Sequence, residues 1–196
     1  GDQSGAMHAL REALILYRDR GSRLGEANSL ASTGNVQSQS RDFQCALRSF
    51  SEAQELYRNL GNKLGEANVL ISLAVLRRLS GDVPGAMRTL QEALNICHDL
   101  GDKGGTAAAL NEAGALYRSA GEMGLASTCH RQSLALAQQV GSRAEEARAL
   151  AELGRCQVVL GRWEVAKIQL RQALLVYQYM GAAEASDLAV ELDTLP

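Results

Sequence analysis

The chain lacks the features of several large protein classes. No apolar run in its 196 residues approaches the ~18 residues that a membrane-spanning helix needs. The N-terminus lacks the basic-then-apolar layout of a secretory signal peptide. No segment has the alternating pattern of a β-strand. These absences favour an all-α, cytoplasmic protein without a membrane partner.

Charge and cysteine usage narrow the class further. The net charge is −2 and the isoelectric point is about 6.0, so the overall basic charge expected of a nucleic-acid-binding protein is missing. No two cysteines form a CxxC pair, which favours reduced and mostly buried thiols over a disulfide framework. The four cysteines are Cys45, Cys97, Cys129 and Cys156.

No residue pattern indicates catalysis. A Ser/His/Asp set, paired carboxylates and a glycine-rich phosphate loop are all missing. Cys129 and His130 are adjacent, and neighbouring residues on a helix point about 100° apart, so both cannot face one metal ion. We therefore predict that the chain is not an enzyme and has neither a metal site nor a cofactor.

What the sequence does contain is a 40-residue repeat. Glycines recur in this register at Gly21, Gly61, Gly101, Gly141 and Gly181, and alanines and leucines keep it too. A fixed period of 20–50 residues indicates a solenoid, in which each repeat buries its apolar face by stacking on its neighbours. With 46% hydrophobic and 21% charged residues, the composition is that of an ordinary folded protein.

Each repeat contains two amphipathic helices. In residues 61–100, Ala67, Leu70 and Ala74 recur at helical spacing, and Ala86 and Leu90 begin a second such stripe. Glycines such as Gly61 and Gly81 are expected to end the helices in a left-handed conformation. The pattern predicts helices near 3–19, 22–39, 43–59, 62–79, 83–99, 102–119, 123–139, 142–159, 163–179 and 182–193.

Polar residues after the glycine turns are candidate helix caps. Asp42, Asn62, Asp82 and Asp102 each precede a predicted helix and can accept a hydrogen bond from its first turn. Ser142 and Glu145 have the spacing of a capping box.

The phase of the repeat sets the domain prediction, a single solenoid over residues 1–196. Gly1-Asp2 aligns with Gly81-Asp82, so residues 1–20 are the second helix of a truncated repeat, and we expect a longer parent protein. A C-terminal capping helix follows the last full repeat. The full repeats are 21–60, 61–100, 101–140 and 141–180, and the capping segment is 181–196.

The repeat resembles the tetratricopeptide repeat (TPR) in its 40-residue form. The first helix carries the small residue of the family pattern at Gly34, Ala74, Gly114 and Gly154, and the second helix carries a small residue at Ala46, Ala86, Ala126 and Ala166. A large apolar residue follows at Phe50, Leu90 and Leu170. The resemblance implies a right-handed superhelix of antiparallel helix pairs. The segment LYRNLGNKLGEANVL is similar to repeats of kinesin light chains and spindle-orientation adaptors, and to C-terminal arrays of actinobacterial antibiotic-regulatory activators and signalling NTPases.

The repeat register also places unusual residues. His8 and His98 share a column with arginines, which indicates exposure to solvent, whereas His130 takes the place of a core leucine. We expect His130 to be a buried, neutral, hydrogen-bonded histidine; the alternative is a polar defect that loosens its repeat. Cys156 is predicted to lie in the core and Trp163 to pack between repeats.

A second, variable stripe on the first helix of each repeat is the candidate binding surface. In TPR arrays these helices line a concave groove, and the stripe changes from amides through small residues to arginines along the chain. Amides can hold an extended peptide backbone, and arginine can bind a carboxylate through two hydrogen bonds. The alternative is that these are merely polar residues facing a wet groove. The candidate residues are Asn28, Asn35, Asn68, Arg78, Asn111, Arg118, Arg148 and Arg155.

These observations predict a protein–protein interaction module that holds a peptide or helix, from another protein or from its own parent chain, as the regulatory part of a bacterial signalling or transcription-regulatory protein. The alternative is a sensor of a small ligand or signalling peptide that switches an attached effector domain. A nucleic-acid reader is disfavoured because Glu112 and Glu152 lie on the stripe. The apolar face of residues 3–19 has no first helix to cover it, which predicts self-association.

Overall fold

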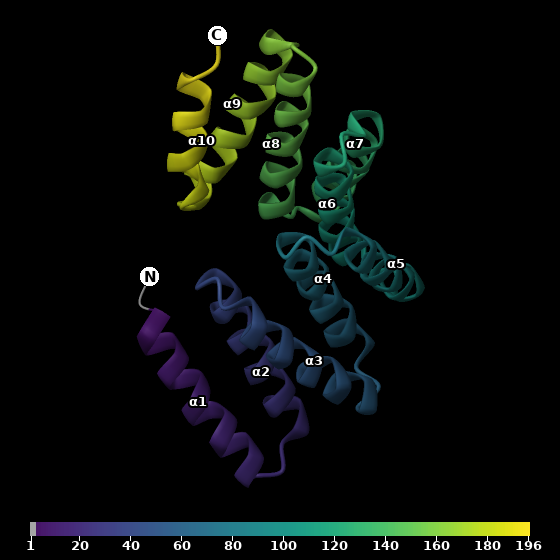
Figure 1. The fold of residues 1–196 in the computed structure, drawn as a ribbon, viewed down its shortest axis with the longest axis vertical. Helices are drawn as coiled ribbons and strands as arrows, with labels where there is room; N and C mark the ends of the chain where they lie inside the picture. Colours follow the sequence, from purple (N-terminus) through teal and green to yellow (C-terminus); the bar gives the residue numbers. More distant parts are fainter. Residues whose placement is uncertain (1–2) are drawn as a thin grey trace. The chain divides into compact units, whose positions relative to one another are not determined.

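The computed structural model describes residues 3–196 as ten α-helices, and no strand occurs among these residues (Figure 1). The predicted helix boundaries differ from the observed ones by at most two residues. The helices are α1 (Gln3–Asp19), α2 (Arg23–Gln39), α3 (Phe43–Asn59), α4 (Lys63–Leu79), α5 (Val83–Leu100), α6 (Lys103–Ser119), α7 (Met123–Val140), α8 (Arg143–Val159), α9 (Trp163–Met180) and α10 (Glu184–Asp193).

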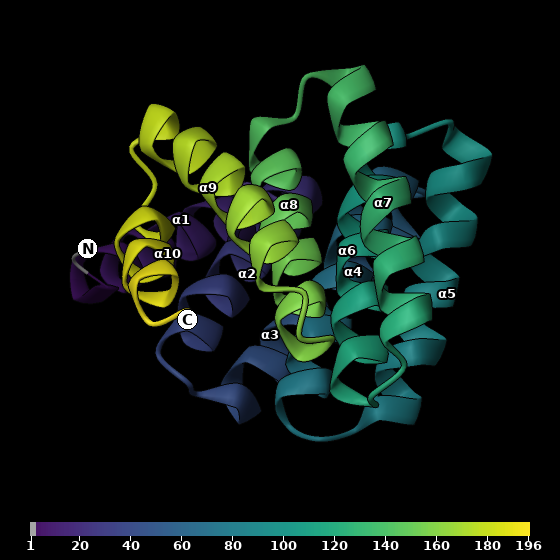
Figure 2. The ribbon, with the colours of Figure 1, turned by 90° about the horizontal axis from the view of Figure 1, so that it is seen from above.

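The helices form two compact units that divide the chain between the second and third full repeats. Unit 1 is Gly1–Leu100, of which residues 3–100 are described, and unit 2 is Gly101–Pro196. In unit 1 each helix packs on the next, and α2 with α3 and α4 with α5 form the closest pairs. In unit 2 the closest pairs are α6 with α7 and α8 with α9, which run side by side in Figure 2. Consecutive pairing of this kind makes the fold an all-α solenoid.

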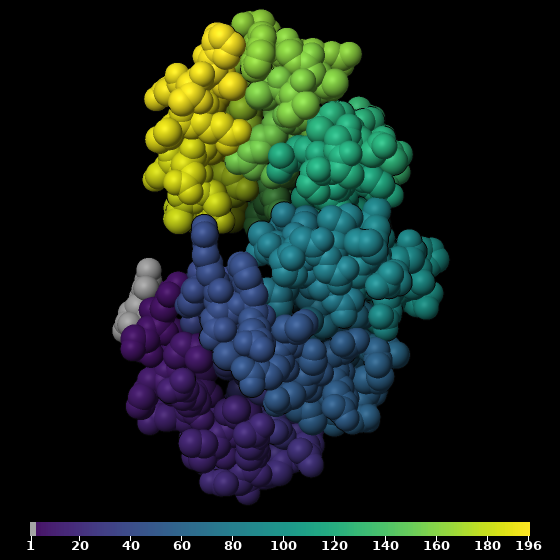
Figure 3. All heavy atoms as spheres, in the orientation of Figure 1, coloured from purple at the N-terminus to yellow at the C-terminus, as the bar shows by residue number. Residues whose placement is uncertain are grey.

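The core of each helix pair combines a small residue with a large one. A Cβ atom on Gly34 would lie 2.7 Å from the Phe50 ring, and one on Gly154 would lie 2.6 Å from Leu170. Both large side chains are buried. The absence of a side chain at these glycines therefore lets the paired helices approach closely enough to bury the large residue. As the space-filling view shows, side chains fill much of the space between the ribbons within each unit (Figure 3).

The turns between helices follow a 20-residue rhythm. Eight glycines have positive φ angles, among them Gly61 at 66° and Gly81 at 86°, as predicted for left-handed helix ends. The same position in the turn after α2 is Arg41, which adopts φ 60° and is the non-glycine exception among the described residues. Arginine pays a steric cost there that glycine avoids.

The predicted caps form in unit 1 and at the start of unit 2. The side chains of Asp42, Asn62, Asp82 and Asp102 each accept a hydrogen bond from a backbone N–H three residues later, at 2.9–3.2 Å. The predicted capping box of Ser142 and Glu145 is wrong. Ser142 precedes α8 but makes no capping hydrogen bond, and the Glu145 carboxylate accepts from Asn111 rather than from the backbone of Ser142.

Helix α1 is the least buried element of unit 1. None of its residues is buried, and on its inward face Leu10 and Leu14 are half-buried while Tyr17 is 39% exposed, so this face is only partly covered. Trp163, which we expected to pack between repeats, keeps 39% of its surface exposed. His8 and His98 are exposed as predicted, and Cys156 is buried as predicted.

Candidate functional site

A groove in unit 1 contains the predicted amide residues. It lies between the first helices of two repeats, α2 and α4, and the buried rings of Phe50 and Tyr57 from α3 form its floor. Its volume is about 280 Å³. We call it the amide groove; its polar lining comes from Asn28, Ser32 and Asn35 on α2 and from Asn68 and Ser72 on α4.

Several amide groups in the amide groove are not used in hydrogen bonds within the protein. The Tyr57 hydroxyl donates to Asn28 Oδ1 at 2.7 Å, which leaves the two N–H donors of the Asn28 amide for another partner. Asn35 and Asn68 are exposed, and within the described chain neither side-chain amide makes a hydrogen bond; the Ser72 hydroxyl donates only to the backbone oxygen of Asn68. Burial raises the pKa of Tyr57, so its hydroxyl stays protonated and remains a donor to Asn28.

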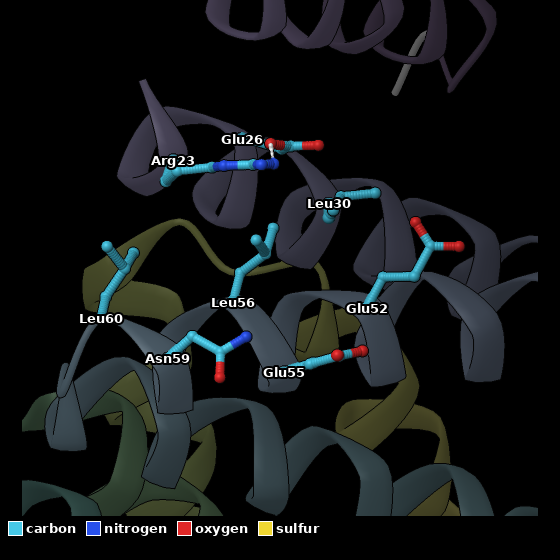
Figure 4. A pocket seen from close by; sticks show the side chains of 8 residues that line it. All are labelled: Arg23, Glu26, Leu30, Glu52, Glu55, Leu56, Asn59 and Leu60. Carbon is cyan, nitrogen blue, oxygen red and sulfur yellow. Dashed lines mark hydrogen bonds and ion pairs between the residues drawn. The ribbon is translucent and has the colours of Figure 1, made fainter. Parts of the chain in front are cut away.

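A larger hollow of about 510 Å³ lies on another face of α2 and α3 (Figure 4). Leu30 and Leu56 line it together with the carboxylates of Glu26, Glu52 and Glu55. Hydrogen bonds from Arg18 and Arg23 hold Glu26, and the bond from Arg18 is the main reason that the pKa of Glu26 is lowered despite its burial. Glu26 therefore serves the packing of α1 on α2 rather than standing ready for a ligand.

The corresponding stripe of unit 2 is occupied by ion pairs. Arg148 on α8 pairs with Glu112 on α6, which is only 2% exposed. Arg118 lies 2.9 Å from Glu152. Arg155 lies 2.7 Å from Glu152 and 2.8 Å from Glu191 of α10. We call these six residues the ion-pair face.

The charges of the ion-pair face stabilise one another. Burial by itself raises the pKa of Glu152, but Arg118 and Arg155 lower it below the ordinary value. Burial likewise opposes the charge of Arg155, yet its hydrogen bonds to Glu191 and Glu152 raise its pKa above the ordinary value. Glu152 and Arg155 are therefore both charged in the folded protein, and each charge is compensated within unit 2.

The predicted site residues thus fall into separate sets. Asn28, Asn35 and Asn68 meet in the amide groove, whereas Arg118, Arg148 and Arg155 belong to the ion-pair face. Arg78 is half-buried in the last turn of α4 and is not among the groove-lining residues. Asn111 is fully buried, so it has no surface to offer a partner.

Asn111 instead joins a buried polar cluster in unit 2. Its amide donates to Glu145 Oε2 at 2.7 Å, and its Oδ1 lies 3.1 Å from His130 Nδ1. Because Asn111 Oδ1 accepts, His130 carries its proton on Nδ1. Burial lowers the pKa of His130 to about 4 and raises the pKa of Glu145. The prediction of a buried, neutral, hydrogen-bonded His130 is confirmed; its partners were missed, although each occupies a column that is small or apolar in other repeats.

Sequence reasoning also missed a recurring ion pair at the repeat junctions. Arg18 on α1 lies 2.7 Å from Glu26 on α2, and Arg58 on α3 lies 2.8 Å from Glu66 on α4. Glu66 is 2% exposed and also contacts Lys63 at 2.9 Å. Arg18 and Arg58 share the column of His98, for which the register indicates exposure to solvent; they are half-exposed, but each also holds a buried carboxylate. Both partners recur 40 residues apart in the sequence, and this spacing could have predicted the pair.

The described residues offer neither a metal site nor a membrane span. Within residues 3–196, no group of three or more histidine, cysteine, aspartate or glutamate side chains is arranged to hold a metal ion. In the same part of the chain, every helix is too short or too polar to cross a lipid bilayer.

Comparisons with known proteins agree with this architecture. Two family models described as "Tetratricopeptide repeat" match residues 69–104 and 105–178, together more than half of the chain. No curated protein matches significantly.

Among solved structures, BtubC (BKLC) from P. vanneervenii is 15% identical with a TM-score of 0.76; the match covers 98% of this chain and 82% of that one. A Rap protein complexed with Competence and Sporulation Factor is 16% identical with a TM-score of 0.78, over 95% of this chain and 57% of that one. A putative kinesin light chain repeat protein from Podosopora anserina is 15% identical with a TM-score of 0.65, over 92% and 89%.

Proposed function

Because the chain belongs to the tetratricopeptide repeat family, whose fold is a scaffold for protein–protein interaction, we propose that its amide groove binds an extended peptide segment of a protein partner. Proteins with this repeat and fold are typically scaffolds without enzymatic activity. The observation that carries the proposal is the meeting of three exposed asparagines, Asn28, Asn35 and Asn68, on two neighbouring helices above a tyrosine that orients one of them.

The chemistry of the groove suits a peptide backbone. A backbone presents one N–H donor and one C=O acceptor per residue, and an asparagine amide can pair with both. Amides carry no charge, so they recognise the backbone with little dependence on side-chain charge. Phe50 and Tyr57 add a rigid floor, because both rings are buried against α2 and α4.

The arginines of unit 2 could bind a peptide only if a carboxylate of the peptide replaced the glutamate that each arginine already contacts. An acidic side chain or C-terminal carboxylate could bind Arg148 or Arg155 by replacing Glu112, Glu152 or Glu191. Competition of this kind weakens binding, since the intramolecular carboxylates are already in place. We therefore assign the main contacts to Asn28, Asn35 and Asn68.

A sensor of a signalling peptide is the second candidate. The solved Rap protein holds Competence and Sporulation Factor, and its fold is similar to that of this chain. In this version a peptide ligand in the amide groove would switch an effector domain in a larger bacterial regulatory protein. Tight binding of a short free peptide would favour the sensor, whereas binding only to a segment within a folded protein would favour the scaffold.

Affinity capture from the source cell tests the proposed groove. The wild-type chain is compared with an Asn28→Ala/Asn35→Ala/Asn68→Ala variant, and bound proteins are quantified by mass spectrometry. The matched control is Asn59→Ala/Asn95→Ala, which removes exposed amides from α3 and α5 outside the groove. We expect a partner that the groove variant loses and the control keeps. A partner retained equally by all three chains would place the site elsewhere.

Self-association through α1 is a further part of the proposal. The face of Leu10, Leu14 and Tyr17 is only partly covered, while the matching residues Phe50 and Tyr57 of α3 are buried. Apolar surface of this kind favours contact with a second copy at high concentration. Sedimentation should show a mass that rises with concentration and falls to the monomer in a Leu10→Ser/Leu14→Ser variant. A monomer mass at every concentration would contradict it.

A further inference from the structure

The outward face of α9 carries an exposed apolar stripe that the repeat architecture does not require. Val165, Ile168, Leu175 and Tyr179 are 45%, 57%, 66% and 84% exposed, in that order. None of these four side chains is buried in the core between α8 and α9. Burial in the fold therefore does not account for their apolar character.

The other second helices of the repeats serve as internal controls. The equivalent positions of α3 are Cys45, Arg48, Glu55 and Asn59. Those of α5 are Gly85, Arg88, Asn95 and Asp99. Helices α1 and α7 have apolar residues at some of these positions, such as Ile15 and Leu125, but the positions of Ile168 and Tyr179 are polar or charged in all four other second helices. The fold therefore does not require apolar residues there, and the apolar set of α9 points to a contact outside unit 2.

The spacing of the stripe indicates the kind of contact. With the exposed Gln172 included, the residues lie at 165, 168, 172, 175 and 179, alternating steps of three and four. This alternation is the heptad seam along which one helix packs against another. A single polar residue within such a seam, here Gln172, favours one register over its alternatives.

The charges beside the stripe select the partner. The second helices of unit 2 expose Arg131 and Arg171, and Arg162 precedes α9. The acidic residues of the same stretches are Glu164, which lies 3.7 Å from Lys167, and Glu122, which precedes α7, so the basic side chains outnumber them. A second copy would bring like charges together, whereas acidic residues on a partner would complement them. We propose that this stripe docks an amphipathic helix of another protein, with apolar residues at heptad spacing and glutamates or aspartates along its margins. The stripe shares no residue with the amide groove.

Two synthetic three-heptad peptides test the proposal. Both have leucine and isoleucine along the seam; one carries glutamate and the other lysine at the flanking positions, where like charges keep each peptide from pairing with itself. Fluorescence anisotropy measures their binding to the full chain. We expect the glutamate peptide to bind and the lysine peptide to bind at least tenfold more weakly.

A Leu175→Ser/Tyr179→Ser variant should raise the Kd of the glutamate peptide at least tenfold. The matched control, Glu55→Ser/Asn59→Ser at the equivalent positions of α3, should leave it unchanged. Because all four positions are exposed, circular dichroism should show the same melting for both variants. Equal affinity for the two peptides, or no binding of the glutamate peptide at its highest soluble concentration, would overturn the proposal.

Two further results would reassign the surface. A dimer in sedimentation that the Leu175→Ser/Tyr179→Ser variant abolishes would make a second copy the occupant. Binding to phosphatidylserine vesicles that the same variant abolishes, without binding of the glutamate peptide, would make it a membrane contact. Either result would overturn the proposal that the stripe docks an acidic amphipathic helix.

Discussion

Units 1 and 2 use the same stripe of their first helices in opposite ways. In unit 1 the stripe is Asn28 and Ser32 on α2, then Asn68 and Ser72 on α4, and it faces an open groove. In unit 2 three of the four equivalent positions are charged, namely Glu112, Arg148 and Glu152, and Glu112 is buried beneath its ion pair with Arg148. Uncharged amides stay solvated and accessible, whereas opposite charges at the same spacing bind one another and close the surface.

This difference shows that register alone does not define a binding surface. Both stripes look variable and polar in the sequence. Whether their polar groups bond to one another within the fold depends on whether the side chains are uncharged amides or opposite charges. In unit 2 the polar residues join α6, α8 and α10, whereas in unit 1 they stay exposed, as the proposed peptide binding requires.

The largest expected effect comes from breaking the ion-pair face. Arg148→Asn gives α8 the residue that α2 and α4 carry at this position, but it leaves the buried carboxylate of Glu112 without this cation. Removing one partner of a buried pair costs about 3–5 kcal/mol of unfolding free energy. Hydrogen exchange should show the loss in α6 and α8. Arg148→Asn/Glu112→Ser, which copies unit 1, should lose much less; equal losses for the single and double variants would contradict the role of the pair.

The second effect is a dependence of the unfolding free energy on pH, caused by the buried His130 of unit 2. Unfolded His130 gains a proton near pH 6.5, whereas the folded form gains one only near pH 4, because burial disfavours its charge. The unfolding free energy should therefore fall as the pH drops from 6.5 to 4, by about 3 kcal/mol in all. Urea denaturation measures it. Glu145 acts in the opposite sense because its pKa is raised, so the informative quantity is the difference from His130→Leu.

His130→Leu should remove that part of the pH dependence, since Leu90 and Leu170 fill the same column without a titrating group. At neutral pH the variant should cost about 1–3 kcal/mol, because Asn111 Oδ1 loses its buried partner. An unchanged pH profile would mean that His130 does not titrate as its burial implies.

A third test concerns the turns, which differ at one position. Unit 1 has Arg41 in the left-handed conformation that every other such turn in the described residues gives to glycine. Arg41→Gly should stabilise the chain by about 1 kcal/mol, because glycine adopts φ near 60° without a steric penalty. Thermal unfolding measures the gain. The matched variant Gly121→Arg in unit 2 should lose a similar amount, and two unchanged melting temperatures would contradict the steric argument.

The sequence predicted the helices because their signals are local and repeated. The residue types of Leu70 and Ala86 recur in every full repeat, so core positions could be compared directly. The ion-pair face could not be predicted in the same way. Whether Arg155 meets a ligand or Glu191 depends on how α10 packs, and α10 departs from the repeat. The Asn111–His130–Glu145 cluster was missed for a similar reason: all three residues are exceptions in their columns, but they come from three helices, and the sequence does not show that these helices bring them together.

The smallest expected change in stability comes from the exposed asparagines of the amide groove in unit 1. Asn35→Ala and Asn68→Ala remove exposed groove side chains that bond to no described residue, so each should change the unfolding free energy by less than about 0.5 kcal/mol. If the amide groove holds a peptide backbone, the same variants should still weaken partner binding severalfold, because each lost hydrogen bond is worth about 1 kcal/mol. Chemical denaturation and titration calorimetry on the same samples separate the two effects. A clear loss of stability would show that these amides, like the arginines of unit 2, serve the fold.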